Sequence, residues 1–168
     1  MSKAVLYSIR PEYCKLILDG KKTVEVRKSI PKLDVPFKCY IYETKTPLRW
    51  NKAHNNIIGG EGGRVIAEFM CDKIYDITPH FDVPTFPNQY IFEGAQAEDS
   101  SCLSFEEINS YLKGNQGYGL HISDLVIYNE PKELSEFTAL RKTKFGYEPV
   151  EITRPPQSWC YVEELCGA

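Results

Sequence analysis

The residues best suited to chemistry lie in one short segment, Asp19-Gly20-Lys21-Lys22-Thr23-Val24-Glu25-Val26-Arg27-Lys28. Its alternation of polar and β-branched residues predicts a strand over 23–27. Alternate side chains of a strand share a face, so Thr23, Glu25 and Arg27 are expected at intervals of about 6–7 Å. A carboxylate and a guanidinium on one face, with lysines from the preceding turn, suit a polar and partly anionic ligand.

Two interpretations of this segment are open at the level of sequence. On an exposed strand it is a solvated face, whose ion pair contributes only about 0–1 kcal/mol. At the floor of a cleft, the same side chains form a binding site. Spacing alone does not separate the two.

The neighbouring elements predict a compact strand, helix and strand that position this segment. An apolar run at 4–8 predicts the first strand, and Pro11 is favoured in the first turn of a helix. The helix is expected over 11–19 because apolar residues recur there at helical spacing, and Gly20 is a natural C-cap.

Beyond this opening, the pattern predicts short strands and one further helix. The strands are expected at 38–42, 64–77, 117–122, 125–128 and 150–153, and 137–145 is ambiguous. A Ser-x-x-Glu capping box at Ser104 and Glu107 predicts a helix over 104–113. Short strands with few helices indicate an α+β fold built round a small, partly closed sheet.

Residues 44–63 interrupt the pattern, and their composition predicts a long, flexible, Gly-rich loop. The run Gly59-Gly60-Glu61-Gly62-Gly63 is interpreted as a hairpin-like hinge. A phosphate-binding P-loop is the weaker interpretation, because it needs Gly-Lys-Ser/Thr followed by a helix, and here a strand follows.

Composition places the chain among soluble globular proteins. It has 168 residues, with 42% hydrophobic and 26% charged, and is expected to form a single domain over 1–168. No run approaches the roughly 18 apolar residues of a membrane helix, so no membrane association is expected. The first ten residues lack a secretory pattern, which predicts a cytoplasmic location.

The net charge of -3 hides an asymmetry along the chain. Residues 1–60 hold 12 Lys and Arg against 5 Asp and Glu, whereas residues 61–168 hold 8 against 18. An acidic total argues against coating long nucleic acid, because such binding depends on neutralising phosphates. A basic face for a nucleotide or a short RNA remains open, and so does interleaving of the two halves on folding.

Cysteine and histidine spacing predicts neither a disulfide framework nor a metal site. The six cysteines include no Cys-x-x-Cys pair, and the three histidines are scattered. Cys14, Cys39 and Cys71 each lie among apolar residues, where a reduced cysteine behaves as a small hydrophobe. No cofactor and no metal are expected.

The segment from Ile17 to Arg27 resembles the Gly-x-Lys-x-x-Glu-x-Arg signature of the ASCH domain family, which is related to the PUA fold of RNA-modifying enzymes. The run 6–11 resembles the opening strand and turn of that family. The runs 118–122 and 155–159 are similar to those of phage-associated and bacterial members. The resemblance implies a PUA-like small β-barrel with a mixed, partly closed sheet, flanking helices, and a cleft that receives RNA or a nucleobase-like ligand.

The resemblance also implies a set of ligand-binding residues, namely Tyr7, Ser8, Lys21, Lys22, Glu25, Arg27, His121, Ser158 and Trp159. Lys22 and Arg27 would contact a phosphate or a base carbonyl, and Glu25 would accept from an exocyclic amine. An aromatic would stack on the base, with Tyr7, Trp159 and Trp50 as the candidates. Core packing is the alternative role for Trp159 and for His121.

An enzymatic role is the alternative function. One bacterial branch of the family hydrolyses N4-acetylcytidine with a lysine and a threonine of this motif and a glutamate from elsewhere. Lys22 matches that lysine, but Glu25 occupies the threonine position, and a carboxylate does not replace a hydroxyl nucleophile. In an enzyme, Glu25 would act as general base on water and Lys22 would stabilise the oxyanion. A third hypothesis is binding of a host or phage factor through the loop 44–63.

Overall fold

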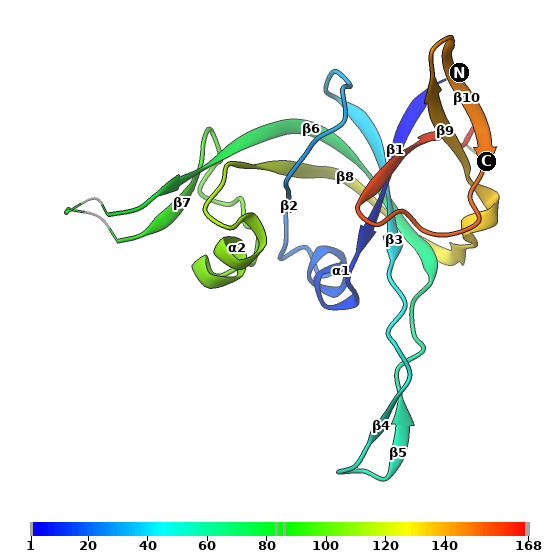
Figure 1. The fold of residues 1–168 in the computed structure, drawn as a ribbon, viewed down its shortest axis with the longest axis horizontal. Coiled ribbons are helices and arrows are strands. Elements are labelled where there is room, and N and C mark those ends of the chain that lie inside the picture. Colours follow the sequence, from blue (N-terminus) through cyan, green and yellow to red (C-terminus); the bar gives the residue numbers. More distant parts are fainter. Residues whose placement is uncertain (1, 83, 86, 167–168) are drawn as a thin grey trace. The chain divides into compact units, whose positions relative to one another are not determined.

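The chain is mostly β. The computed structural model describes residues 2–82, 84, 85 and 87–166, which form eleven strands and two α-helices (Figure 1). In chain order the elements are β1 (Lys3–Ile9), α1 (Pro11–Leu18), β2 (Val24–Arg27), β3 (Phe37–Glu43), β4 (Arg49–Asn51), β5 (Asn56–Ile58), β6 (Arg64–His80), β7 (Gln89–Phe92), α2 (Phe105–Leu112), β8 (Gly117–Lys132), a 3-10 turn (Leu134–Glu136), β9 (Thr138–Thr143), β10 (Gly146–Glu151) and β11 (Trp159–Glu163).

These elements divide into two compact units, each assembled from separated parts of the chain. The first unit comprises Met1–Lys15, Lys38–Phe69 and Leu125–Ala168, and the second comprises Leu16–Phe37 and Met70–Asp124. The long strands β6 and β8 each contribute residues to both units. The expectation of a single domain over 1–168 stays a prediction.

The first unit is built on a mixed sheet in the order β10-β9-β11-β1-β3-β6. β1 lies between a parallel neighbour, β3, and an antiparallel neighbour, β11. Val5 is opposite Cys39 in β3, and Tyr7 is opposite Trp159 in β11. A strand paired on both sides has all its backbone groups satisfied, which suits the nearly continuous apolar sequence of β1.

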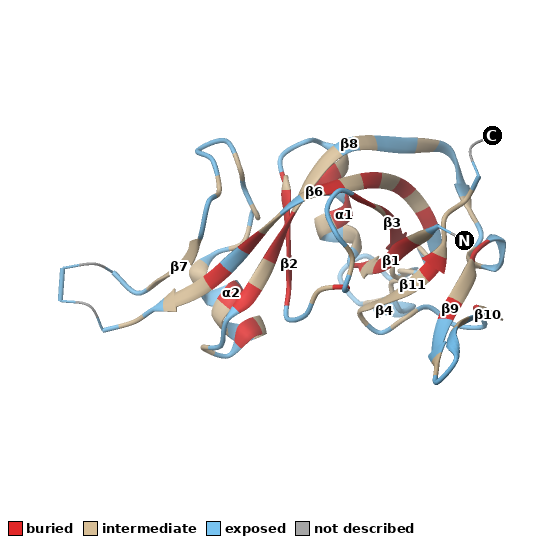
Figure 2. Ribbon diagram, turned by 90° about the horizontal axis from the view of Figure 1, so that it is seen from above, coloured by how far each residue is buried: buried red, intermediate tan, exposed pale blue. Residues whose placement is uncertain are grey.

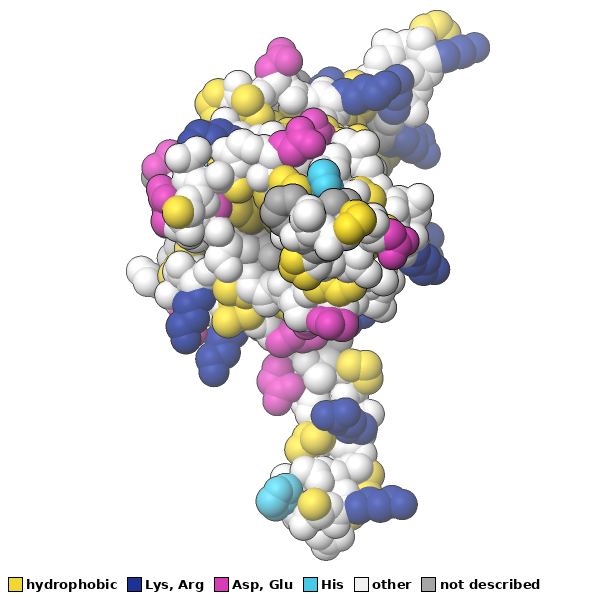
Figure 3. Space-filling model, turned by 90° about the vertical axis from the view of Figure 1, so that its left-hand side faces the viewer, with side chains coloured by type: hydrophobic (Ala, Val, Ile, Leu, Met, Phe, Trp, Pro, Cys, Tyr) yellow, Lys and Arg dark blue, Asp and Glu magenta, His cyan; other side chains and the backbone are white. Residues whose placement is uncertain are grey.

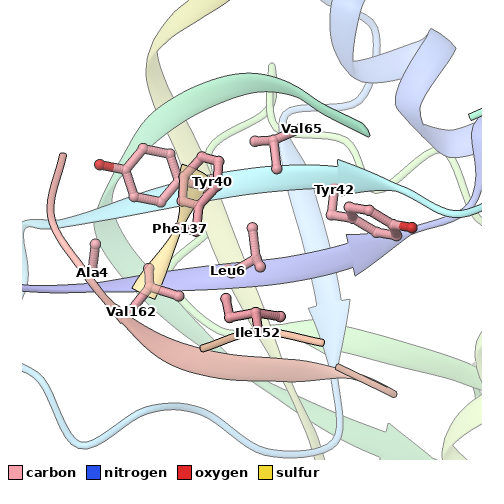
Figure 4. Close-up of a cluster of buried hydrophobic side chains, with 8 residues drawn as sticks. All are labelled: Ala4, Leu6, Tyr40, Tyr42, Val65, Phe137, Ile152 and Val162. Carbon is pink, nitrogen blue, oxygen red and sulfur yellow. The ribbon is translucent and has the colours of Figure 1, made fainter. Parts of the chain in front are cut away.

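The core of the first unit gathers side chains from all parts of that sheet (Figure 4). Tyr40 and Phe137 meet edge to face with ring centroids 5.0 Å apart, a favoured aromatic geometry. The Tyr40 hydroxyl accepts a hydrogen bond from the Leu165 amide at 2.9 Å, so its polar atom is not stranded. The buried members of the cluster are Ala4, Leu6, Tyr40, Tyr42, Val65, Phe137, Ile152 and Val162.

The second unit contains β2, β8 and the later part of β6, in the order β6-β8-β2, with β7 also paired to β6. Helix α2 packs its buried Ile108 and Leu112 with Val26 and Ile77. Its start is the expected capping box, because Ser104 accepts from the Glu107 amide and the Glu107 carboxylate accepts from the Ser104 amide. This predicted helix is therefore confirmed within one residue at each end.

Residues 44–63, which the composition predicts to be a flexible Gly-rich loop, contain the paired strands β4 and β5 and so form a hairpin. Their flexibility stays a prediction. Trp50 lies opposite Ile57 across the two strands. The base of the hairpin is held by the Thr46 amide donating to the Glu61 carbonyl at 2.9 Å and the Gly60 amide donating to the Thr46 carbonyl at 2.7 Å. We call residues 44–63 the arm, which extends beyond β3 and β6 in Figure 1.

Two glycines show why the arm needs its glycine run. Gly59 and Gly62 have φ of +99° and +84°, a region that disfavours side chains. A Cβ on Gly59 would lie 2.2 Å from the Pro47 carbonyl oxygen, and one on Gly62 would lie 2.4 Å from that of Thr44. These glycines therefore serve close strand approach, as the hinge interpretation expects.

Several boundaries differ from the sequence expectation. The strands expected at 117–122 and 125–128 are one strand, β8, in which Asp124 takes a left-handed conformation with φ of 48°. The ambiguous 137–145 holds β9, and the strand expected at 150–153 is the earlier β10. Strands β7 and β11 were not expected.

The mixed, mostly β architecture with two α-helices agrees with the α+β fold expected from the sequence, but closure into a barrel is not confirmed. Within the described residues, neither strand order returns to the strand from which it starts. Over the same residues, no helix has the length and hydropathy needed to cross a membrane.

Candidate functional site

The turn between α1 and β2 places Lys22 at the start of the predicted site. Gly20, two residues after the last residue of α1, adopts φ of +72°, the left-handed conformation that glycine commonly takes just past the end of a helix. The amides of Lys21 and Lys22 both donate to the Leu16 carbonyl, at 2.9 and 3.0 Å. Because the backbone is held at two successive amides, the direction in which Lys22 enters β2 is fixed.

Lys22, Glu25 and Arg27 form one linked group, which we call the charged cluster. The Lys22 Nζ lies 3.3 Å from one Glu25 carboxylate oxygen, and the Arg27 Nη2 lies 3.0 Å from the other. The Lys22 Nζ also donates to the Ser101 carbonyl at 2.7 Å. All three residues are nearly buried, with 2%, 7% and 6% of their surfaces exposed.

This burial decides between the two interpretations of the segment. Every residue of β2 is buried (Figure 2), so the solvated-face interpretation is wrong. Removing an ion from water costs several kcal/mol, and a buried ion pair commonly recovers no more than that cost. Burying two cations with one carboxylate is therefore expected to add little to the free energy of folding. The arrangement also gives these three residues a net positive formal charge.

Thr23 does not join the charged cluster as the strand pattern predicts. The strand begins only at Val24, and the Thr23 hydroxyl accepts a hydrogen bond from the Ser100 amide at 2.9 Å. The amides of Thr23 and Val24 donate in return to the Ser100 carbonyl, at 2.8 and 3.0 Å. Thr23 thus ties the loop before α2 to β2, and the Ser101 carbonyl of that loop reaches Lys22.

His121 lies in a second polar group, the His121 network. Its Nδ1 is 2.6 Å from an Asp72 carboxylate oxygen, and its Nε2 is 3.3 Å from one of Asp99. The Tyr75 hydroxyl donates to the other Asp99 oxygen at 2.7 Å. Both ring nitrogens of His121 thus have carboxylate partners, which favours a structural role over the expected ligand contact.

The pKa values of the network follow from these contacts. Burial is the largest influence on the Asp72 carboxyl and acts to raise its pKa, but the hydrogen bond and electrostatic interaction with His121, together with further hydrogen bonds that include one from Ser123, outweigh it, so the pKa is lowered. Burial is also the largest influence on Asp99, and it is outweighed by the sum of the hydrogen bonds from the Gln96 amide and Tyr75 and the electrostatic effects of His121 and Lys73, so this pKa is lowered too. Burial and the Asp99 contact raise the pKa of Tyr75. The network is therefore built for two ionised carboxylates and a neutral phenol.

Four further predicted residues lie together in the first unit. The rings of Tyr7 and Trp159 are 6.4 Å apart and tilted by 49°. Ser8 Oγ donates to the Pro156 carbonyl at 2.6 Å, and the Ser8 amide donates to the Ser158 carbonyl at 3.0 Å. Tyr7 is fully buried, so core packing describes it better than base stacking does.

Other candidates are distributed more widely. Lys21 is exposed in the second unit, and Trp50 is exposed on the arm. A pocket of about 540 Å³ in the first unit is lined by residues that include Glu151, Arg154 and Gln157. Its lining contains none of the predicted ligand residues. Across the described part of the chain, no three His, Cys, Asp or Glu residues are grouped so as to hold a metal ion.

Four residues of these networks were not expected from the sequence, namely Asp72, Tyr75, Asp99 and Ser101. The sequence offers a weak indication for Asp72, because a charged residue in a strand with buried apolar side chains suggests a specific partner. It offers none for Asp99 and Ser101, since they belong to a loop and one of them acts through its backbone carbonyl.

The chain belongs to the ASCH domain family, whose sequence model matches residues 8–155. The crystal structure of ASCH from Zymomonas mobilis is similar at 21% identity with a TM-score of 0.50, covering 93% of this chain and 85% of that chain. A serine-to-alanine mutant of the same protein matches at 20% identity and a TM-score of 0.50, covering 93% of this chain and 85% of its own. At such identity the likeness concerns the fold. No curated protein matches the chain.

Proposed function

We propose that this protein binds RNA or a nucleotide or nucleobase, with the ligand held in a cleft lined by the charged cluster. The observation that carries the proposal is the linked burial of Lys22, Glu25 and Arg27, joined at 3.3 and 3.0 Å. Because such buried charges contribute little to folding stability, binding of a ligand is the better explanation for their presence.

The chemistry of the cluster is complementary to the edge of a base. Glu25 supplies acceptor oxygens for an exocyclic amine, and Arg27 supplies donors for a carbonyl or a phosphate. Lys22 lies deepest, with its side chain 1% exposed, so we assign it the role of orienting Glu25. Membership of the ASCH family and an acidic total charge both favour a small or short ligand over a long polymer.

A titration with a panel of nucleotides and short RNAs tests the proposal. Arg27→Ala and Glu25→Gln should each weaken binding by about 5- to 150-fold, the range for losing one buried, charge-assisted contact. Lys28→Ala is the matched control, because Lys28 is an exposed neighbour of Arg27 whose ammonium lies 4.8 Å from the centroid of the Tyr111 ring. Circular dichroism of each variant verifies folding. Binding by Arg27→Ala equal to that of the wild type would place the site elsewhere.

Deacylation of an N-acylated cytidine is the second candidate, favoured by the 3.3 Å separation of Lys22 Nζ and Glu25 Oε2. In this reaction Glu25 takes a proton from water, whose oxygen attacks the acyl carbonyl. The resulting oxyanion is stabilised by Lys22. The C–N bond then breaks, and the proton passes from Glu25 to the exocyclic nitrogen, giving cytidine and acetic acid, which releases its remaining proton to solvent as acetate.

Incubation with N4-acetylcytidine tests this candidate. Turnover by the wild type, lost in both Lys22→Ala and Glu25→Ala but kept in Lys28→Ala, would establish an enzyme. Absence of turnover at high enzyme concentration would leave the binding function alone.

A further inference from the structure

The arm exposes three large apolar side chains. Leu48, Trp50 and Ile57 are 71%, 56% and 66% exposed. Trp50 and Ile57 are directly opposite each other in the β4–β5 ladder, so they share one face of the hairpin. An indole ring is costly to leave in water, and this one is held at the end of an ordered hairpin.

The charge of the arm is entirely positive between Thr44 and Gly60. This stretch contains Lys45, Arg49, Lys52 and His54 and no Asp or Glu, within a chain whose total charge is -3. Among the described residues, no ion pair involves Lys45, Arg49 or Lys52. Figure 3 shows Lys and Arg, His and hydrophobic side chains together on this projection at the bottom of the view.

We propose that the arm is a second binding site, which takes single-stranded nucleic acid. Trp50 stacks on one base, and Lys45, Arg49 and Lys52 contact neighbouring phosphates. Each nucleotide of such a strand repeats a base and a phosphate. The aromatic ring is complementary to the π face of the base, and the cations that make no ion pair are complementary to the phosphates. The inference rests on the proposed function and extends it from a nucleoside-sized ligand to a strand.

The structure supplies the preorganisation that such a contact needs. The hydrogen bonds of Thr46 with Glu61 and Gly60 close the base of the arm, and the close approaches at Gly59 and Gly62 leave little room for it to splay. Trp50 is 56% exposed on this two-stranded ribbon, and stacking needs only one open ring face.

The turn between β9 and β10 provides a matched control within the same unit. It carries Phe145, 85% exposed, with the Lys144 ammonium 4.8 Å from the ring centroid. Unlike residues 44–60 of the arm, this hairpin contains acidic residues, and Arg141 is 3.7 Å from Glu148. It therefore tests whether any exposed aromatic with nearby cations has the same effect.

Fluorescence anisotropy with an unstructured RNA and the matching DNA of about 12 nucleotides, over a range of salt concentrations, tests the inference. Trp50→Ala should weaken strand binding by about 5- to 150-fold, and Trp50→Phe should restore most of it. Replacing Lys45, Arg49 and Lys52 together by alanine should reduce the slope of log K against log salt by about 2. Phe145→Ala should change neither quantity.

Several results would overturn the inference. These are unchanged strand binding in Trp50→Ala, an equal loss in Phe145→Ala, and polyglutamate binding as tight as that of RNA. Similar affinities for RNA and DNA would assign the contact to base and phosphate, and a preference for RNA would add the 2′-hydroxyl. Both results support the arm as a strand site.

Mononucleotide binding separates this inference from the proposed function. If mononucleotides bind and the strand binds no more tightly, the arm inference fails while the function of the charged cluster stands. If the strand binds through Trp50 and no mononucleotide or nucleobase binds the cluster, the cleft assigned to the charged cluster fails, whereas RNA binding and the arm site stand.

Discussion

The charged cluster and the arm use the same cationic residue types in opposite environments. Lys22 and Arg27 are buried and joined through Glu25, whereas Lys45, Arg49 and Lys52 lie on a hairpin without acidic residues between Thr44 and Gly60. Buried charges interact strongly but demand fixed partners, and exposed charges act weakly, at longer range and under screening by salt. The difference indicates that the cluster is suited to selecting a ligand and the arm to attracting a strand.

Removing the carboxylate from the charged cluster should have the largest effect on stability. Glu25→Ala leaves the buried Lys22 and Arg27 without their shared anion, and should lower the free energy of unfolding by about 3–5 kcal/mol. Glu148→Ala, which removes the partner of Arg141 from an exposed pair, should cost about 0–1 kcal/mol. Urea unfolding of both variants measures the difference. Equal losses would show that burial does not distinguish the cluster.

The next largest effect is expected at the base of the arm. Gly62→Ala places a residue with φ of +84° under backbone strain of about 1–3 kcal/mol and also drives its Cβ against the Thr44 carbonyl. Gly94→Ala has a similar φ of +82° but meets nothing within 4 Å, so it carries the strain alone. Hydrogen exchange of the Thr46 amide should accelerate in Gly62→Ala only. An unaltered rate would mean that the glycine is not needed for strand approach.

Acid should weaken the second unit through the His121 network. The folded-state pKa values of Asp72 and Asp99 are lowered, so the stability that they contribute is present above about pH 4 and is lost as pH falls through the folded values. Thermal unfolding of Asp99→Asn between neutral pH and pH 3 should therefore decline less steeply than that of the wild type. If the unfolding temperatures of the variant and the wild type fell equally with pH, Asp99 would not contribute to the loss of stability in acid.

The smallest effect on stability is expected in the arm. Trp50→Ala should change the free energy of unfolding by no more than about 0.5 kcal/mol, because this side chain is already 56% exposed. A loss of several kcal/mol would show that Trp50 is part of a folded core and is not held for a ligand.

The local parts of the site could be predicted from the sequence. Residues two apart on a strand share a face whatever the fold, which brings Glu25 and Arg27 together, and a short turn keeps Lys22 near. The hydrogen bond from Lys22 to Ser101 joins residues 79 positions apart, and no periodicity reports such a contact. The predicted residues of β1 and β11 lie together for a further non-local reason, since Tyr7 pairs with Trp159 near the other end of the chain.

The fold was predictable to a similar degree and for the same reason. Helix α2 follows from its own capping residues, whereas β11 depends on a partner strand far away in sequence. Polar Ser123 and Asp124 predict a break in β8, yet the strand continues through a left-handed residue. The arm has a loop composition, and its strand pairing depends on glycines whose role is visible only in three dimensions.

The division of β6 and β8 between two units has a consequence for biosynthesis. The last segment of the second unit ends at Asp124, whereas the first unit requires Leu125–Ala168 and the pairing of β1 with β11. A nascent chain that leaves the ribosome with its N-terminus first therefore presents every residue of the charged cluster and the His121 network before the sheet of the first unit can be completed. β1 therefore cannot complete its pairing until β11 has been synthesised.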